Sequence, residues 1–201
     1  MNIEAAIEAI SHISIKPMQG KPEIILDYKK DLTISKEWSE DVLGEYAPQH
    51  VRITLYIKAI HQASTQLHIP EDDLCLVVLL HELGHWLWHM ALDDYGNNWQ
   101  NYGQVAPDLS ELLAQLCVCW ASHDGVLQSK KEQINFVLFE LMKKQSTIYK
   151  LPKEHACLKP LSISPECFYE IRELQFVTLE PGTDLIDLII GCIEVSKLVK
   201  M

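Results

Sequence analysis

The spacing of apolar and polar residues along the chain predicts a mostly helical protein with a few short strands. Apolar residues recur at helical intervals in six segments: 3–10, 57–67, 70–90, 108–122, 130–145 and 185–199. The segment 23–28 is short and apolar, which favours a strand, whereas 51–57 alternates apolar and polar residues as a half-buried strand does. The segment 168–179 fits either a strand or a helix. The polar segment 93–107, rich in Gly, Asn and Asp, is predicted to be a functional loop.

Composition and charge narrow the class of protein without identifying it. The 201 residues are 48% hydrophobic, which is enough for a sizeable core within a single domain spanning 1–201. The formal net charge of -11 argues against nucleic acid as a partner, because phosphate binding needs clustered lysine and arginine. The same charge argues against an anionic membrane surface, and it leaves the oligomeric state undecided.

The cysteines and the first residues of the chain indicate a cytoplasmic protein with reduced thiols. The six cysteines contain no Cys-x-x-Cys pair, and a core-rich chain of this size does not need a disulfide framework. Residues 1–8 are acidic and amphipathic, whereas a secretory signal begins with basic residues and continues with an apolar stretch. The longest apolar run is too short to span a bilayer, so we predict no membrane association.

The most informative residues are His-Glu-Leu-Gly-His at 81–85, inside a strongly apolar segment. Positions four apart share one face of a helix, so His81 and His85 are placed to bind one zinc ion. Glu82 is then placed to reach a water molecule on the metal without joining the ligands. Gly84, which lacks a side chain, is expected to leave room near the ion. The alternative is a metal-free helix edge capped by two histidines, but an apolar segment makes such buried polar groups costly.

A catalytic zinc site needs a third protein ligand and an open position for water, and Glu111 is the best candidate. It lies near the start of the predicted helix 108–122, and Gln115, one turn later, could donate a hydrogen bond to a ligand. The competing interpretation of Glu111 is a capping box with Asp108. His89 continues the histidine stack, but the helix rotates it away, so a supporting or core role is favoured over ligation. The remaining candidate ligands are Glu140, Asp93 and Asp94.

These residue types suit the hydrolysis of peptide bonds. Zinc would lower the pKa of its bound water, and Glu82 would take the proton as the water attacks a carbonyl and then pass it to the leaving amine. A further donor is needed for the oxyanion, and the sequence does not choose among five candidates: Tyr95, Tyr102, His123, Tyr149 and His155. The strand 51–57 could present an exposed edge to which an extended peptide adds, or it could be an ordinary strand of the sheet.

The chain resembles the zincin metallopeptidases, and among them the gluzincins with a glutamate third ligand, through four residues: His81, Glu82, His85 and Glu111. Residues 81–89 also look like those of ImmA/IrrE-type intracellular peptidases. The resemblance implies an α+β fold, with a small twisted sheet packed on the active-site helix and a mostly helical remainder. It implies zinc, water activation by Glu82 and a protein or peptide substrate. It covers residues 23–122, and a helical C-terminal part over 130–201 is expected to follow.

Functions from different classes remain open. The first is a zinc-dependent intracellular peptidase with Glu82 as general base, and the second is a catalytically silent zinc-binding protein with an interaction or regulatory role. A metal-free helical regulator is the third. Retention of Glu82 favours the peptidase, because a purely structural zinc site has no use for a general base. A fourth protein ligand, for instance Cys117 or His89, would instead indicate a closed site.

Overall fold

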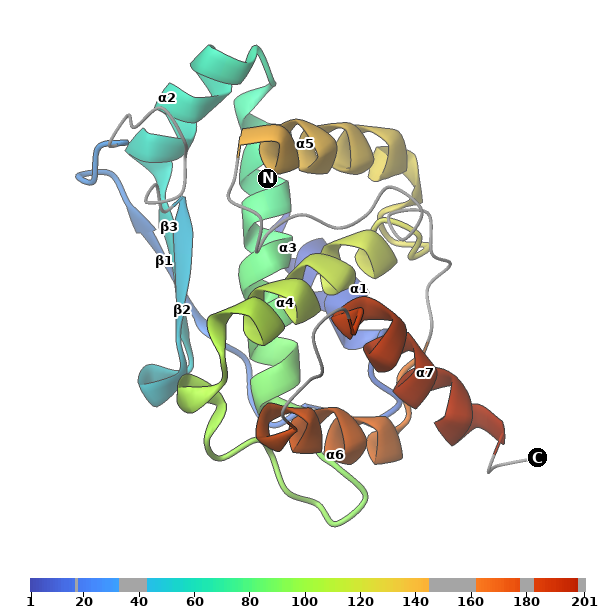
Figure 1. The fold of residues 1–201 in the computed structure, drawn as a ribbon. Coiled ribbons are helices and arrows are strands. Elements are labelled where there is room, and N and C mark those ends of the chain that lie inside the picture. The colour runs from blue at the N-terminus through green and yellow to red at the C-terminus, as the bar shows by residue number, and fades with distance from the viewer. Residues whose placement is uncertain (17, 33–42, 145–161, 178–182, 199–201) are drawn as a thin grey trace.

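The computed structural model describes residues 1–16, 18–32, 43–144, 162–177 and 183–198. Within these ranges the fold is α+β and mostly helical, with seven α-helices and one small mixed sheet of three strands (Figure 1). The helices are α1 (Ile3–Ser11), α2 (Ile57–Leu67), α3 (Glu71–Met90), α4 (Pro107–Ala121), α5 (Lys131–Lys144), α6 (Pro165–Glu173) and α7 (Leu185–Leu198). The strands are β1 (Glu23–Asp27), β2 (Gly44–Ala47) and β3 (Arg52–Tyr56). The six helices predicted from apolar spacing are confirmed as α1, α2, α3, α4, α5 and α7.

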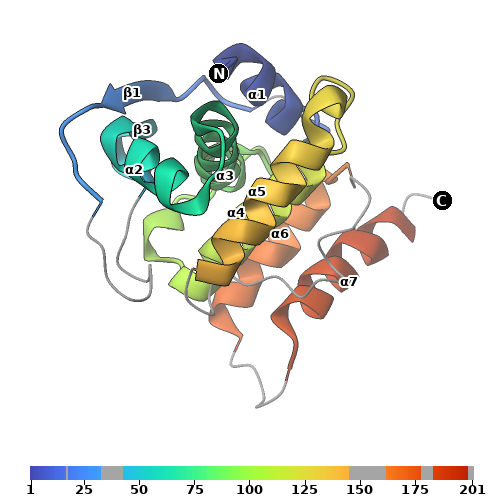
Figure 2. The same cartoon turned by 90° about the horizontal axis from the view of Figure 1, so that it is seen from above.

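Helix α3 runs through the middle of the molecule, with the sheet on one side and α4 and α5 on the other (Figures 1 and 2). From Leu74 to Trp88 the helix is apolar on nearly every face, and every side chain in this stretch except His81 is buried. A helix that is apolar all round has to be covered all round. Here α1, α2, α4, α5 and β2 pack against it, so the histidines lie on a helix that is covered on several sides.

The sheet has the strand order β1-β3-β2, with β3 parallel to β1 and antiparallel to β2. Of the two alternatives for the segment 51–57, the exposed edge is therefore wrong and the ordinary strand of the sheet is confirmed, because β3 is the central strand and is paired on both sides. Its residues from Ile53 to Tyr56 are all buried, so the alternating sequence does not mark a half-exposed strand. The edge strands are β1 and β2, and β2 is not predicted from the sequence. It has only four residues, Gly-Glu-Tyr-Ala, too few for an alternation to be recognised.

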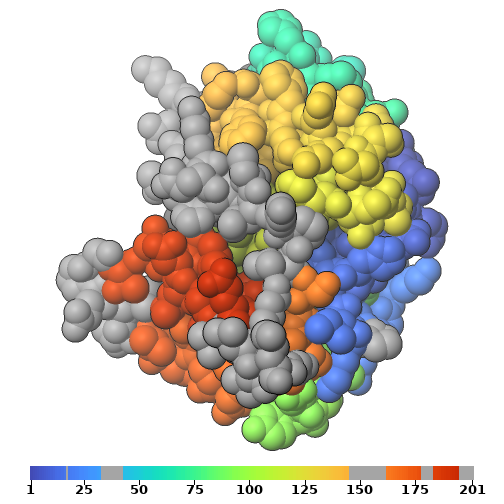
Figure 3. All heavy atoms as spheres, turned by 90° about the vertical axis from the view of Figure 1, so that its right-hand side faces the viewer, coloured from blue at the N-terminus to red at the C-terminus, as the bar shows by residue number. Residues whose placement is uncertain are grey.

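The helical C-terminal part shares the face away from the sheet with N-terminal residues, and on this face α5 lies above α6 and α7 (Figure 3). The segment 168–179, which the sequence permits as strand or helix, begins within α6 and continues as a 3₁₀ turn over Leu174–Phe176. The five cysteines that the structure describes are free thiols. Across the described ranges, no helix combines the length and the apolar character needed to cross a membrane.

Candidate metal centre

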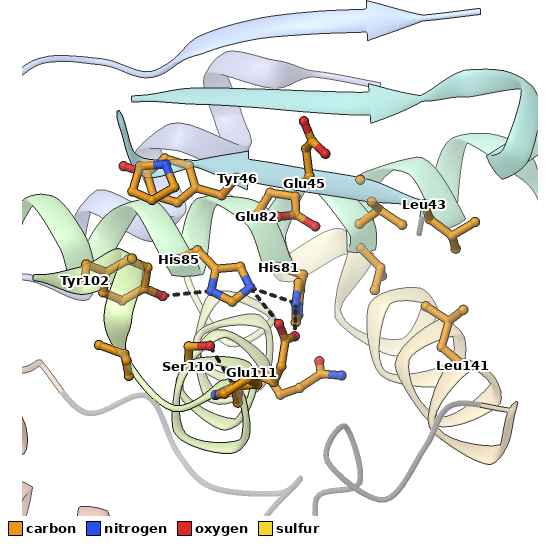
Figure 4. A pocket seen from close by; sticks show the side chains of 18 of the residues that line it. Leu43, Glu45, Tyr46, His81, Glu82, His85, Tyr102, Ser110, Glu111 and Leu141 are labelled. Atoms are coloured by element: carbon orange, nitrogen blue, oxygen red, sulfur yellow. Dashed lines mark hydrogen bonds and ion pairs between the residues drawn. The ribbon is translucent and has the colours of Figure 1, made fainter. Parts of the chain in front are cut away.

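The side chains of His81 and His85 of α3 and of Glu111 of α4 converge (Figure 4). The Nε2 atoms of His81 and His85 are 3.2 Å apart, as expected for positions one turn apart on the same helix face. Oε2 of Glu111 lies 2.9 Å from Nε2 of His81, and Oε1 lies 3.6 Å from Nε2 of His85. Three potential metal donors from two helices are thus within 4.8 Å of one another.

Close packing of α4 on α3 brings Glu111 to the histidines. A Cβ atom at Gly84 would lie 3.0 Å from both Cα and the carbonyl oxygen of Ala114 and 3.0 Å from Cβ of Cys117. The small residues Gly84 and Ala114 therefore let the two backbones touch, one turn beyond His81 on α3 and one turn beyond Glu111 on α4. The expectation that Gly84 makes room for an ion is wrong, because the space that it leaves is filled by α4.

Glu111 does not cap α4. The N-cap is Ala106, followed by Pro107, and no side chain caps the helix, so the capping-box alternative with Asp108 is wrong. Burial opposes ionisation of Glu111, but hydrogen bonds with His81 and His85 outweigh it and hold the pKa of the carboxyl far below its ordinary value. A carboxylate that is ionised and faces two imidazoles is in the state that a metal ligand requires.

Two further side chains orient the histidines. The hydroxyl of Tyr102 lies 2.7 Å from Nδ1 of His85, which leaves Nε2 of that ring to face the donor group. Gln115 is hydrogen-bonded to His81. Burial raises the pKa of Tyr102 well above its ordinary value, so the phenol stays protonated. Partners of this kind fix the tautomer and direction of histidines that bind metals.

His89 lies one turn beyond His85 and outside the donor group. Its Nδ1 is 2.6 Å from the hydroxyl of Tyr46 in β2, and its ring stacks on Tyr102 with centroids 5.5 Å apart. Burial, with a contribution from the charge of Arg172, lowers the pKa of His89, which favours the neutral ring. The structure therefore places His89 as a support between β2 and Tyr102.

Glu82 is buried, with 6% of its surface exposed, and it lies between α3 and β2 beside the two histidines (Figure 4). It is not part of the donor group. Burial raises the pKa of its carboxyl above the ordinary value, against the opposing effect of His81 and His85. A buried carboxyl with a raised pKa, held next to a candidate metal position, is suited to act as a general base.

The donor group, Glu82, Tyr102 and Gln115 line one cavity of about 470 Å³ between β2, α3, α4, α5 and the turn that carries Tyr102. His81, Glu82, His85 and Glu111 line one part of it. Part of the remaining wall is apolar and is made by Leu43, Val77, Val78, Leu138 and Leu141. The cavity therefore joins the candidate metal position to a space for an apolar group.

Several predicted site residues lie elsewhere. Tyr95 is 74% exposed and contacts Tyr169, and His123 is bonded to the carbonyl of Cys119 at the end of α4. Neither lines the cavity, so neither is placed to act on a group bound there. The other two oxyanion candidates, at 149 and 155, lie outside the described ranges. Of the alternative ligands, Glu140 pairs with Lys143, and Asp93 and Asp94 pair with Arg172 and Lys16.

Three residues that support the site were not recognised in the sequence: Gly44, Tyr46 and Arg172. The first two belong to the unrecognised strand β2. The last lies in α6, where its guanidinium donates to the carbonyls of Trp88 and Ala91 at the end of α3. A lone charged residue in a helix gives no signal of that role.

The arrangement can hold a metal ion through two imidazole nitrogens and one carboxylate. In the part of the chain that the structure describes, no further histidine, cysteine, aspartate or glutamate joins this donor group. Cys117 lies beneath Gly84 and His89 faces Tyr46, so neither is placed as a fourth ligand. Three protein donors leave a coordination position for water or a substrate.

Comparison with protein-family models, with curated proteins and with solved structures finds no match to this chain. The interpretation of the site therefore depends on its own geometry.

Proposed function

We propose that the protein is a zinc-dependent peptidase that acts on protein or peptide substrates in the cytoplasm. One observation carries the proposal: His81, His85 and Glu111 converge, while Glu82 faces the same cavity without joining them. A metal site without a catalytic role has no use for a carboxylate that faces the ion and does not bind it. Such a carboxylate is useful when a water molecule has to lose a proton.

The donor chemistry supports zinc as the metal. Zinc accepts two histidines and a carboxylate in catalytic sites, with bonds of about 2.0–2.1 Å. A tetrahedral ion with such bonds separates its donors by about 3.3 Å. The two Nε2 atoms are 3.2 Å apart, and the Glu111 carboxylate lies 2.9 Å from His81 through Oε2 and 3.6 Å from His85 through Oε1, which is close to that spacing. The same donor set supports a zincin of the gluzincin type.

The chemistry follows from the positions of the protein groups. Bound zinc would lower the pKa of a coordinated water and polarise the carbonyl under attack. Glu82 accepts the proton of the attacking water and then delivers it to the leaving amine. Tyr102 keeps the His85 ring in the ligating tautomer, and Gln115 is a hydrogen-bonding partner of His81.

The edge strand β2 supports a peptide as the substrate. It packs directly on α3 and contributes Gly44, Glu45 and Tyr46 to the wall of the cavity. An extended peptide that pairs with the outer edge of a strand gains backbone hydrogen bonds with little dependence on its sequence. A peptide lying along β2 would pass the candidate metal position.

A catalytically silent zinc-binding protein is the second candidate. The observation in its favour is the position of the oxyanion donors within the described ranges. Tyr95 and His123 lie away from the cavity, and Tyr102 is bonded to His85. A peptidase needs such a donor, so activity has to be measured directly.

The test compares the zinc-loaded full chain with Glu82→Gln on unfolded casein and on a fluorogenic peptide mixture. The expected result is hydrolysis by the wild type, a loss of about a hundredfold or more in the variant, and one zinc per chain in both. His85→Ala should lose the zinc. Equal turnover by the wild type and Glu82→Gln would contradict the mechanism, and no turnover by the wild type would favour the silent protein.

A further inference from the structure

The strand β2 touches the candidate general base at a residue with no side chain. Gly44 is buried and pairs with Leu55 of the central strand, so its position is fixed by the sheet. A Cβ atom placed on Gly44 would lie 2.9 Å from Cγ1 of Val78 and 3.1 Å from both Cγ and Oε1 of Glu82. Real Cβ atoms essentially never come within 3.0 Å of another heavy atom, so some atom would have to move.

Glycine is needed at position 44 because a side chain would collide with α3, and not because the backbone conformation requires glycine. Among the described residues the glycines with positive φ are Gly20 and Gly96, and Gly44 adopts a conformation open to any residue. Contact with the strand leaves the Glu82 side chain no room on that side. The backbone of β2 thus acts as a wall that holds the Glu82 carboxylate in the cavity.

This contact involves the base and not the metal ligands. The three atoms nearest to an added Cβ belong to Val78 and Glu82, and none belongs to His81, His85 or Glu111. The other glycine packed against α3, Gly84, faces the backbone of Ala114 and serves the packing of two helices. The two glycines therefore have different roles on opposite flanks of the same helix.

We propose that Gly44 is a positioning residue for the reaction: it lets the edge strand lie directly on Glu82 and so fixes the carboxylate that receives the proton of the attacking water. This inference rests on the proposed function for its catalytic meaning, but its geometric part stands on the contacts alone. A methyl group at this position displaces Glu82 or lifts β2 from α3. Displacement of the Glu82 carboxylate is expected to slow proton transfer, because a misplacement of about 1 Å can cost about a hundredfold in rate.

The experiment compares Gly44→Ala with Gly125→Ala in the zinc-loaded full chain. Gly125 is a matched control, because an added Cβ there has no atom within 4 Å and its φ is not positive. We expect kcat of Gly44→Ala to fall by about ten- to a hundredfold, with KM changed less than threefold and zinc content unchanged. Gly125→Ala should match the wild type.

A second pair of variants separates positioning of the base from packing of the strand. Val78→Ala removes the closest neighbour of the added methyl, but the contacts with Glu82 at 3.1 Å remain. Gly44→Ala/Val78→Ala should therefore be as stable as Val78→Ala and still show the lower kcat. If the double variant recovers the kcat of Val78→Ala, the effect is packing and the proposal is wrong.

Crystal structures of the wild type and Gly44→Ala give a test that needs no activity. The expected result is a changed rotamer or a shift of the Glu82 carboxylate, with the His81, His85 and Glu111 positions unchanged. An unmoved Glu82 overturns the inference whether or not the protein is a peptidase. A wild type without hydrolysis but with a displaced Glu82 in the variant overturns the proposed function and leaves the geometric role of Gly44 supported.

Discussion

The phenol of Tyr102 and the imidazole of His85 are joined at 2.7 Å through Nδ1 of the ring. Because Nε2 of His85 faces His81 and Glu111, the hydrogen bond at the other nitrogen decides which tautomer is present. If Nδ1 carries the proton and donates it to the phenol oxygen, Nε2 is free to bind a metal. The hydrogen bond between the 3₁₀ turn that carries Tyr102 and His85 of α3 therefore favours the tautomer in which His85 can bind a metal.

Tyr102→Phe is predicted to weaken zinc binding by about tenfold, since loss of a partner to a ligating histidine commonly costs ten- to a hundredfold in affinity. The ring and its stacking on His89 are retained, so the fold should survive. Competition with a zinc-binding dye measures the affinity. Tyr95→Phe is the control, because Tyr95 is 74% exposed and lies away from the cavity. Equal affinity in both variants would show that Tyr102 does not orient the ligand.

Local periodicity explains why much of the site could be predicted from the sequence. Helix α3 extends from Glu71 to Met90, and its geometry alone places His81 beside His85. The approach of Glu111 needed one more condition, the packing of α4 on α3. The small residues Gly84 and Ala114 permit that packing, but a sequence does not show that two small residues face each other.

The parts that were not predicted depend on contacts between distant segments. The four residues of β2 can be recognised as a strand only from their pairing with β3, and the strand order is set by the packing of the whole sheet. An alternating sequence at 51–57 suggests one solvent-exposed face, but α3 packs against β3 and its residues from Ile53 to Tyr56 are buried. Arg172 donates to a carbonyl 81 positions earlier, a distance that no local pattern records.

The ion pair between Glu111 and His81 is predicted to make the metal-free protein most stable in weak acid. Burial disfavours both charges, but the hydrogen bond between them lowers the pKa of Glu111 from 4.5 and raises that of His81 from 6.5. The lowered pKa gives stability that is present above about pH 4.5 and lost as the pH falls further. The raised pKa gives stability that is present below about pH 6.5 and lost as the pH rises further.

Urea unfolding of the wild type and Glu111→Gln, with a chelator present, measures this effect. The difference between the two proteins in free energy of unfolding should be about 1–3 kcal/mol near pH 5.5 and smaller at pH 3 and pH 9. Asp108→Asn, an exposed acid in the same helix, should show no such maximum. A difference that is constant across this range would mean that the pair is not ionised in the metal-free protein.

Arg172 is predicted to stabilise the end of α3 from the C-terminal part of the chain. Its buried guanidinium donates to the carbonyls of Trp88, Ala91 and Asn97 and lies 3.6 Å from Oδ2 of Asp93.

Removal of the guanidinium leaves the buried Asp93 carboxylate without its cationic partner and the last carbonyls of α3 without this donor. Arg172→Ala should therefore lower the free energy of unfolding by about 3 kcal/mol or more. Lys130→Ala breaks an ion pair with Asp73 whose lysine is 48% exposed, and it should cost about 1 kcal/mol or less. Thermal and urea unfolding of both variants give the comparison. If Arg172→Ala is no less stable than Lys130→Ala, then α6 does not support the helix that carries the histidines, and their positions must be maintained by α4 and the sheet alone.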